Sequence, residues 1–199
     1  MPEGPEIRRA ADRVAEVLAG QVIEKVSFGL PRLRHRSRQL RGARVVEVET
    51  RGKAMLTHFD NGLSIYSHNQ LYGLWRVVVG HRLPESSRSM RLLLQTASHS
   101  AILYSASDIS VWQTEELDTH PFLRKLGPDI MAPSLEWRTV VTRLCDPLFN
   151  ERELASLYLD QAFLAGNGNY LRSEILYDAG INPRCRPVEL SRGELGRLA

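Results

Sequence analysis

The chain has 199 residues, of which 43% are hydrophobic and 25% charged, and its formal net charge is +3. This composition excludes a globally disordered chain and suits one large or two small domains with a real core. No apolar run approaches the about 18 residues that cross a bilayer, no signal peptide is expected, and the two cysteines, Cys145 and Cys185, exclude a disulfide framework or a four-cysteine zinc site.

The N-terminal part is predicted to be a helix followed by a β layer. From Pro5 onward, apolar residues recur at spacings of three and four as far as Leu18, and Gly20 stands where a helix commonly ends. Asp60-Asn61-Gly62 reads as a hairpin connection. Seven short alternating or β-branched runs are predicted strands: 22–28, 44–49, 54–59, 63–67, 74–79, 90–95 and 101–104.

The pattern becomes helical after about Leu117. Leu126-Gly127-Pro128-Asp129 is a cluster of helix- and strand-breaking residues, so we place a domain boundary there, between 1–127 and 128–199. Ser134 is a plausible helix N-cap and Gly180 a plausible helix stop. Helices are predicted over 134–144, 151–163 and 170–179, with a last turn from Ser191. The fold class is therefore α+β, with an N-terminal β-sandwich domain behind a leading helix and a helical second domain.

The Arg/His run over 31–44 is the only dense block of charge. A solvated surface loop is the favoured interpretation, and a loop that contacts phosphates is the alternative.

The first six residues, Met1-Pro2-Glu3-Gly4-Pro5-Glu6, form a candidate chemical site. Removal of Met1 would leave Pro2 with a free secondary amine, and at neutral pH the neutral fraction of an N-terminal amine is far larger than that of a lysine. Attack of such an amine on a carbonyl-like carbon gives an iminium, which stays cationic and acts as an electron sink. Glu3 is close enough to act as acid or base, and Glu6 lies one helical turn further on. The alternative is an ordinary helix start, with proline and acids in the first turn.

Several further motifs accompany this hexapeptide, in register and almost from end to end. Together they resemble the endonuclease VIII branch of the formamidopyrimidine-DNA glycosylase family. They lie at 1–12, 49–54, 66–75, 104–108, 119–123, 127–129, 159–166 and 169–172.

The resemblance implies a bifunctional DNA glycosylase and AP lyase that removes oxidised pyrimidines during base-excision repair. Pro2 would attack C1′ of the damaged nucleotide, and Glu3 would donate the proton that assists base loss and opening of the sugar. Lys53 would donate a proton during β-elimination, and a second elimination would leave a one-nucleotide gap. A lysine suits this role because arginine, which supplies most of the positive charge here, does not readily give up a proton.

The segment Gln70-Leu71-Tyr72 has the chemistry to fill the gap left by an extruded base: an amide, an apolar wedge and an aromatic ring. The family assigns these positions that function. Without the family, Leu71 and Tyr72 would be interpreted as core residues.

In the second domain the resemblance implies a helix–two-turns–helix motif whose turn contains Gly168 and places Asn169 on the DNA backbone. Glycines and N–H groups at a helix start can cradle a phosphate. The residue between the glycines is usually apolar in the family, and here it is Asn167. Lys125 stands where the family usually has a DNA-contacting arginine, so the charge is kept and a bidentate phosphate contact is lost.

The family's zinc hairpin has no ligand set in this sequence, and we expect neither structural zinc nor another cofactor. The expected partners are damaged double-stranded DNA and abasic sites, without a membrane, for a monomeric, cytoplasmic, nucleoid-associated bacterial protein. Two alternatives stay open: a DNA-binding fragment with little turnover, because the hairpin and its arginine are missing, and a general nucleic-acid-binding protein whose proline only starts a helix.

Overall fold

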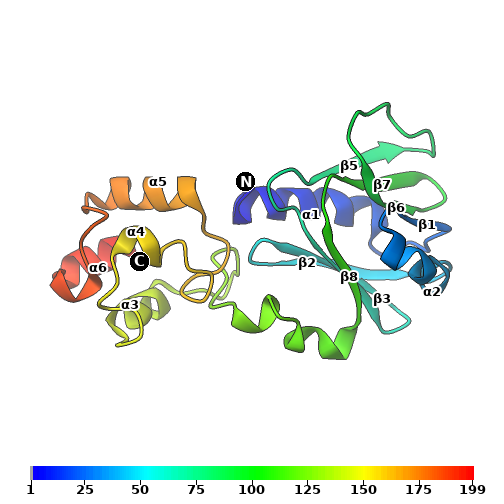
Figure 1. Ribbon diagram of the computed structural model, residues 1–199. Coiled ribbons are helices and arrows are strands. Elements are labelled where there is room, and N and C mark those ends of the chain that lie inside the picture. The colour runs from blue at the N-terminus through cyan, green and yellow to red at the C-terminus, as the bar shows by residue number, and fades with distance from the viewer. Residues whose placement is uncertain (1) are drawn as a thin grey trace. The chain divides into compact units, whose positions relative to one another are not determined.

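The computed structural model describes residues 2–199, which form two compact units (Figure 1). The first unit ends at Leu123, and the second runs from Arg124 to Ala199.

Helix α1 (Gly4–Leu18) opens the first unit, as predicted. Its buried side chains, among them Ile7, Val14 and Leu18, lie on one stripe that packs against the β layer. Gly20 follows the helix with φ of +75°, the left-handed conformation that glycine adopts without strain.

Two antiparallel sheets of four strands make up the body of the first unit. The first sheet has the order β1-β6-β7-β5 and the second the order β2-β3-β4-β8. The strands are β1 (Lys25–Phe28), β2 (Val45–Arg51), β3 (Ala54–Phe59), β4 (Leu63–His68), β5 (Leu74–Val79), β6 (Met90–Gln95), β7 (His99–Tyr104) and β8 (Asp108–Gln113). Phe28, Leu94 and Leu103 of the first sheet share one buried cluster with Met55 and Ile65 of the second, so the predicted sandwich is confirmed.

Strand β8 was not among the seven predicted strands. It begins with an aspartate, which is rare in strands, and it is an edge strand that pairs only with β4. The strand predicted over 22–28 begins only at Lys25, because Val22 makes a single bridge to Arg44.

The Arg/His run folds into the 3-10 helix η1 (Pro31–Arg36) and the short helix α2 (Ser37–Leu40). Leu33 and Leu40 point into the core, so the run is anchored there. A second 3-10 helix, η2 (Thr114–Thr119), follows β8.

The second unit is helical, with a core that includes Val140, Leu144, Phe149, Tyr158 and Phe163. Its elements, with one 3-10 helix at the junction of the units, are η3 (Leu123–Lys125), α3 (Trp137–Cys145), α4 (Leu154–Leu157), α5 (Asn169–Ala179), η4 (Pro187–Glu189) and α6 (Arg192–Leu198). Ser191 caps α6, and Gly180 ends α5 in the left-handed conformation, as predicted. The cap of α3 is Glu136 and not Ser134.

The helix predicted over 151–163 was wrong, since only Leu154–Leu157 is helical. In the segment after it, Asp160 binds Arg152 at 2.6 Å and accepts a hydrogen bond from the Ala162 N–H at 2.8 Å. Arg143 donates to the carbonyls of Ala162 and Phe163, at 2.6 and 2.8 Å. Side chains thus form the hydrogen bonds with backbone N–H and C=O groups that a helix would otherwise provide. Several apolar residues of this segment are buried in the core although its backbone is irregular. Within residues 2–199, no helix is both long and apolar enough to span a membrane.

Candidate active site

The start of α1 fixes the position of the N-terminal residues. The backbone N–H of Glu3 donates to Glu6 Oε2 at 3.0 Å, and Glu6 Oε1 accepts from Arg9 at 2.9 Å. Glu6 therefore satisfies an N–H group at the helix start and is itself held by Arg9. Glu3 is only 3% exposed, and Pro2 beside it is half-buried. Met1 lies outside the described residues, so its predicted removal has no structural counterpart.

Lys53 is brought to Glu3 from about fifty residues away in the chain. It lies in the tight turn between β2 and β3, where Gly52 has φ of +60°, and it is 6% exposed. Burial lowers the pKa of Lys53, and the negative charge of Glu3 raises it in opposition. Two predicted catalytic groups are thus buried within electrostatic reach of one another, and Lys53 gives up its proton more readily than a surface lysine.

A cavity of about 620 Å³ opens beside Pro2, between one face of α1 and the start of β5. Its size lies in the range of small-ligand sites. The buried Trp75 contributes an indole N–H that has no hydrogen-bond partner within residues 2–199. The lining residues include Pro2, Glu6, Arg9, Arg13, Asn69, Trp75 and Arg76. The cavity thus offers hydrogen-bond donors next to the proposed nucleophile.

A cluster of histidine and aromatic side chains lies close enough to Lys53 for the charge of Lys53 to act on His68. Ala54, His68 and Asp108 are cross-strand neighbours on β3, β4 and β8, so the register alone lines them up. The Tyr66 hydroxyl donates to Asp108 Oδ2 at 3.3 Å, and the Tyr66 ring stacks on His120 with centroids 4.0 Å apart. Burial raises the pKa of Tyr66, so its phenol keeps its proton.

Both histidines of this cluster accept a backbone hydrogen bond. Nδ1 of His68 accepts from the Gln70 N–H at 3.0 Å, and Nδ1 of His120 accepts from the Phe122 N–H at 3.1 Å. Burial lowers the pKa of each ring, Asp108 opposes that effect in both, and the charge of Lys53 lowers the pKa of His68 further. His68 is therefore a neutral neighbour of Lys53. Chain order alone did not single out His68 or Asp108; their cross-strand register was the missing signal.

The loop between β4 and β5 carries the predicted wedge. Leu71 is 62% and Tyr72 71% exposed, so neither is a core residue. Gly73 closes the loop by donating its N–H to the Asn69 carbonyl at 2.7 Å, and a Cβ at Gly73 would come within 2.6 Å of Asn69 backbone atoms. The closed loop leaves these two apolar side chains facing solvent.

In the second unit, Gly168 is the N-cap of α5 and Asn169 its exposed first residue. Asn167 is 0% exposed, and neither atom of its amide has a hydrogen-bond partner within residues 2–199. Lys125 is exposed at the end of η3. Of the residues in this unit that are predicted to contact the DNA backbone, Asn169 and Lys125 are thus accessible and Gly168 is buried.

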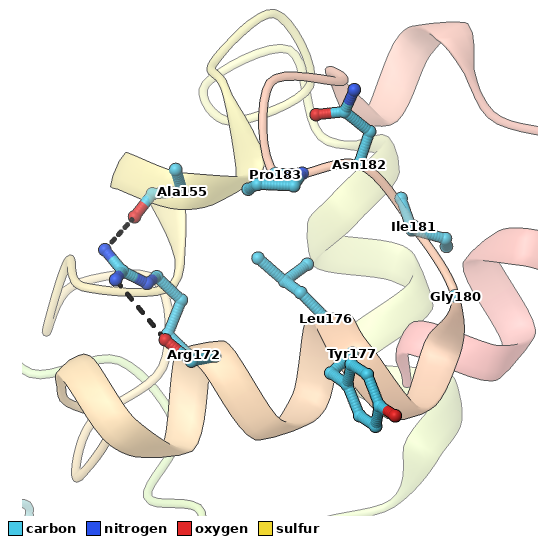
Figure 2. A pocket seen from close by; sticks show the side chains of 9 residues that line it. Ala155, Arg172, Leu176, Tyr177, Gly180, Ile181, Asn182 and Pro183 are labelled. Carbon is cyan, nitrogen blue, oxygen red and sulfur yellow. Dashed lines mark hydrogen bonds between the residues drawn. The ribbon is translucent and has the colours of Figure 1, made fainter.

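A second cavity, of about 640 Å³, lies beside α5 (Figure 2). Figure 2 shows Leu176 and Ile181 on its wall, and Arg172 donating to the Ala155 carbonyl at 3.3 Å. Its lining contains no acid, cysteine or histidine: Ala155, Arg172, Ser173, Leu176, Tyr177, Gly180, Ile181, Asn182 and Pro183. The cavity therefore lacks the carboxyl, thiol and imidazole groups that most often carry out acid–base or nucleophilic chemistry, and it offers only the hydroxyls of Ser173 and Tyr177.

The described residues do not fit a metal centre. Within 2–199 no three or more His, Cys, Asp or Glu side chains are grouped to hold a metal, and Cys145 and Cys185 are free thiols. The zinc site implied by the resemblance therefore does not fit the residues present here.

Three comparisons relate this chain to known proteins. A sequence profile of the formamidopyrimidine-DNA glycosylase N-terminal domain matches residues 1–107. Endonuclease 8 of Escherichia coli is 52% identical over 199 residues, which are 100% of this chain and 76% of that protein. Endonuclease 8 of Shigella flexneri is 51% identical over the same shares of the two chains. The chain thus spans about three quarters of the length of these relatives.

Solved structures share the fold at low sequence identity. A Lactococcus lactis Fpg (MutM) bound to DNA containing an oxidised pyrimidine superposes with a TM-score of 0.84 and 19% identity, over 99% of this chain and 75% of that one. The same protein with N7-benzyl-Fapy-dG DNA gives a TM-score of 0.83 at 19% identity, over 99% of this chain and 74% of that one.

Proposed function

This chain belongs to the formamidopyrimidine-DNA glycosylase family, and from that membership we propose which of its residues carry out base-excision DNA repair. The protein is a DNA glycosylase and AP lyase. The burial of Glu3 and Lys53 within electrostatic reach of each other, beside Pro2, is the observation that carries the assignment of residues.

Pro2 is the proposed nucleophile. After removal of Met1, the lone pair of its secondary amine forms the bond to C1′ of the damaged nucleotide as the bond from C1′ to the base breaks. Glu3, in its protonated form and with Glu6 holding its backbone N–H, donates a proton that assists departure of the base and opening of the sugar at O4′. The base and O4′ need two protons between them, and the second is the one that the Pro2 nitrogen loses as the iminium forms. The product is an iminium, whose positive charge acidifies the hydrogens at C2′.

Lys53 is the proposed proton donor of the lyase step. A C2′ proton leaves to water, and the electron pair of that C–H bond passes through an enamine to break the C3′–O bond and expel the 3′ phosphate, to which Lys53 donates its proton. Loss of a C4′ proton then expels the 5′ phosphate in a second elimination, which leaves the gap. The lowered pKa of Lys53 makes its proton easier to transfer, and the neutral His68 adds no competing positive charge.

Damaged double-stranded DNA is the proposed substrate, with oxidised pyrimidines as the bases removed. Solved neighbours are complexes with damaged DNA, and one of them holds an oxidised pyrimidine. In this proposal Leu71 and Tyr72 enter the gap left by the extruded base, which their exposure allows, and Gln70 meets the base opposite.

We assign catalysis to residues 1–127 and DNA-backbone binding to residues 128–199. Gly168 and Asn169 would bind a phosphate at the start of α5, and Lys125 would add a positive charge. The protein is expected to act as a monomer on chromosomal DNA in the bacterial cytoplasm.

Borohydride trapping on abasic DNA tests the proposal. The reagent reduces the iminium to a stable amine, so the wild type should form a covalent adduct that Pro2→Gly or retention of Met1 abolishes. Lys53→Met should slow strand cleavage strongly, whereas Lys25→Met, which removes an exposed lysine from β1, is the matched control and should not. DNA retardation without any adduct would overturn the proposal in favour of a binding protein.

A further inference from the structure

Gln70 is held at two points in the structure. Its backbone has φ of +53°, and its N–H donates to His68 Nδ1 at 3.0 Å. Its side-chain oxygen Oε1 accepts from the Ser107 hydroxyl at 2.9 Å and lies 3.5 Å from the Ser107 backbone nitrogen, which also donates to it. Gln70 and Ser107 lie in different loops of the first unit, before β5 and before β8.

The loop that carries Ser107 is itself fixed. The Arg32 guanidinium donates to the carbonyls of Ser107 and Ile109, both at 3.0 Å. These bonds hold the backbone on either side of Asp108, the first residue of β8. Ser107 therefore presents its N–H and hydroxyl to Gln70 from a defined position.

These contacts decide which way the Gln70 amide points. A backbone N–H can only donate, so the amide atom that faces it must be the oxygen. The nitrogen then points away, and its two N–H groups have no hydrogen-bond partner within residues 2–199. The free end of this side chain is a pair of donors.

We infer that Ser107 is a positioning residue that makes Gln70 a donor-only contact for the base opposite the lesion. The inference rests on the proposed function, in which Gln70 meets that base. An amide that could turn freely would offer either its oxygen or its nitrogen to a base, whereas this one offers only N–H groups.

The consequence is a permissive choice of the opposite base. Each natural base has an acceptor on its pairing edge: N1 of adenine, O6 of guanine, N3 of cytosine and O4 of thymine. A donor-only contact can bind all four, so sensitivity should appear only when that acceptor is removed. In 1-deazaadenine a C–H group replaces N1 of adenine, which makes it the matched probe.

The experiment measures single-turnover borohydride trapping on duplexes with an abasic site opposite adenine or opposite 1-deazaadenine. Loss of one hydrogen bond predicts that the wild type reacts about 2- to 10-fold more slowly opposite 1-deazaadenine. Gln70→Ala should bring this ratio close to one. Ser107→Ala removes the 2.9 Å hydroxyl bond and keeps only the 3.5 Å backbone contact, so the amide can turn its oxygen toward the adenine amino group and the ratio should move toward one. Ser107→Thr, which keeps the hydroxyl, should restore the wild-type ratio.

Ser107 is exposed, so neither substitution threatens the core. If Ser107→Ala had only a structural effect, it would slow trapping equally on both duplexes and leave the ratio of the two trapping rates at its wild-type value. That result would overturn the inference. A wild type that forms adducts at equal rates on both duplexes would overturn the inference alone. A wild type that forms no adduct on either duplex would overturn the proposed function together with it.

Discussion

Replacing Asn167 with leucine is expected to stabilise the second unit. The Asn167 side chain is 0% exposed, and neither its nitrogen nor its oxygen has a hydrogen-bond partner within residues 2–199. Burying an unpaired amide costs about 1–3 kcal/mol. Leucine has the same number of side-chain heavy atoms and no polar group, so it avoids that cost, but its methyl groups are bulkier than the amide.

We expect the free energy of unfolding to rise by about 2 kcal/mol, because strain around the leucine side chain offsets part of the stabilisation that comes from removing the unpaired amide. Amide hydrogen exchange of α5, followed at increasing urea concentrations, measures the free energy of unfolding of the second unit separately from that of the first. A rise of about 2 kcal/mol slows exchange about 30-fold. The Gln161 amide donates to the Asn167 backbone carbonyl at 2.9 Å, and that bond survives the substitution.

Two further variants separate the causes. Asn167→Ala removes the amide but leaves a cavity, so its stability should change little. Asn167→Asp buries an unpaired carboxylate and should be strongly destabilised. If Asn167→Leu were no more stable than the wild type, the amide would be hydrogen-bonded in solution and the reasoning refuted.

Three other predictions concern the loop, the lysine and an ion pair. Gly73→Ala puts a Cβ 2.5 Å from the Asn69 carbonyl oxygen, so the loop must open. Excision of a damaged base from duplex DNA should then fall about 10- to 100-fold, while borohydride trapping on single-stranded abasic DNA persists. A variant as active on duplex DNA as the wild type would contradict this prediction. Glu3→Gln removes the charge that raises the pKa of Lys53 against burial, so that pKa falls further. The alkaline limb of lyase activity on preformed abasic sites should then move to lower pH, and an unmoved limb would assign it to another group. Burial raises the pKa of Asp160, but its hydrogen bonds with an arginine and a backbone N–H outweigh burial and hold it below the ordinary value. A carboxyl whose pKa is lower in the folded than in the unfolded state stabilises the fold above the unfolded-state pKa, and this stabilisation is lost as the pH falls through the folded-state pKa. Asp160→Asn should therefore lower the free energy of unfolding by about 1 kcal/mol at neutral pH and leave it unchanged in strong acid. Urea unfolding midpoints measured across this pH range test the prediction.

The sequence by itself determined the parts that depend on local periodicity and on motifs. The apolar stripe of α1, the Gly20 and Gly180 stops and the Asp60-Asn61-Gly62 hairpin all follow from neighbouring residues. The candidate residues came from the motifs in which this sequence resembles the family, together with the chemistry of the residue types at those positions. Local patterns were wrong over 151–163, where Asp160 and Arg143 satisfy the backbone in place of a helix.

Only the tertiary structure decided what depends on pairs distant in the chain. Glu3 and Lys53 influence each other because α1 packs on the sheet that carries the turn between β2 and β3. The exposure of Leu71, which the apolar pattern alone would place in the core, follows from the closure of its loop. The contact of Ser107 with Gln70 likewise joins two loops 37 positions apart. Burial and hydrogen bonding between remote residues are set by packing, and no local pattern of residue types encodes them.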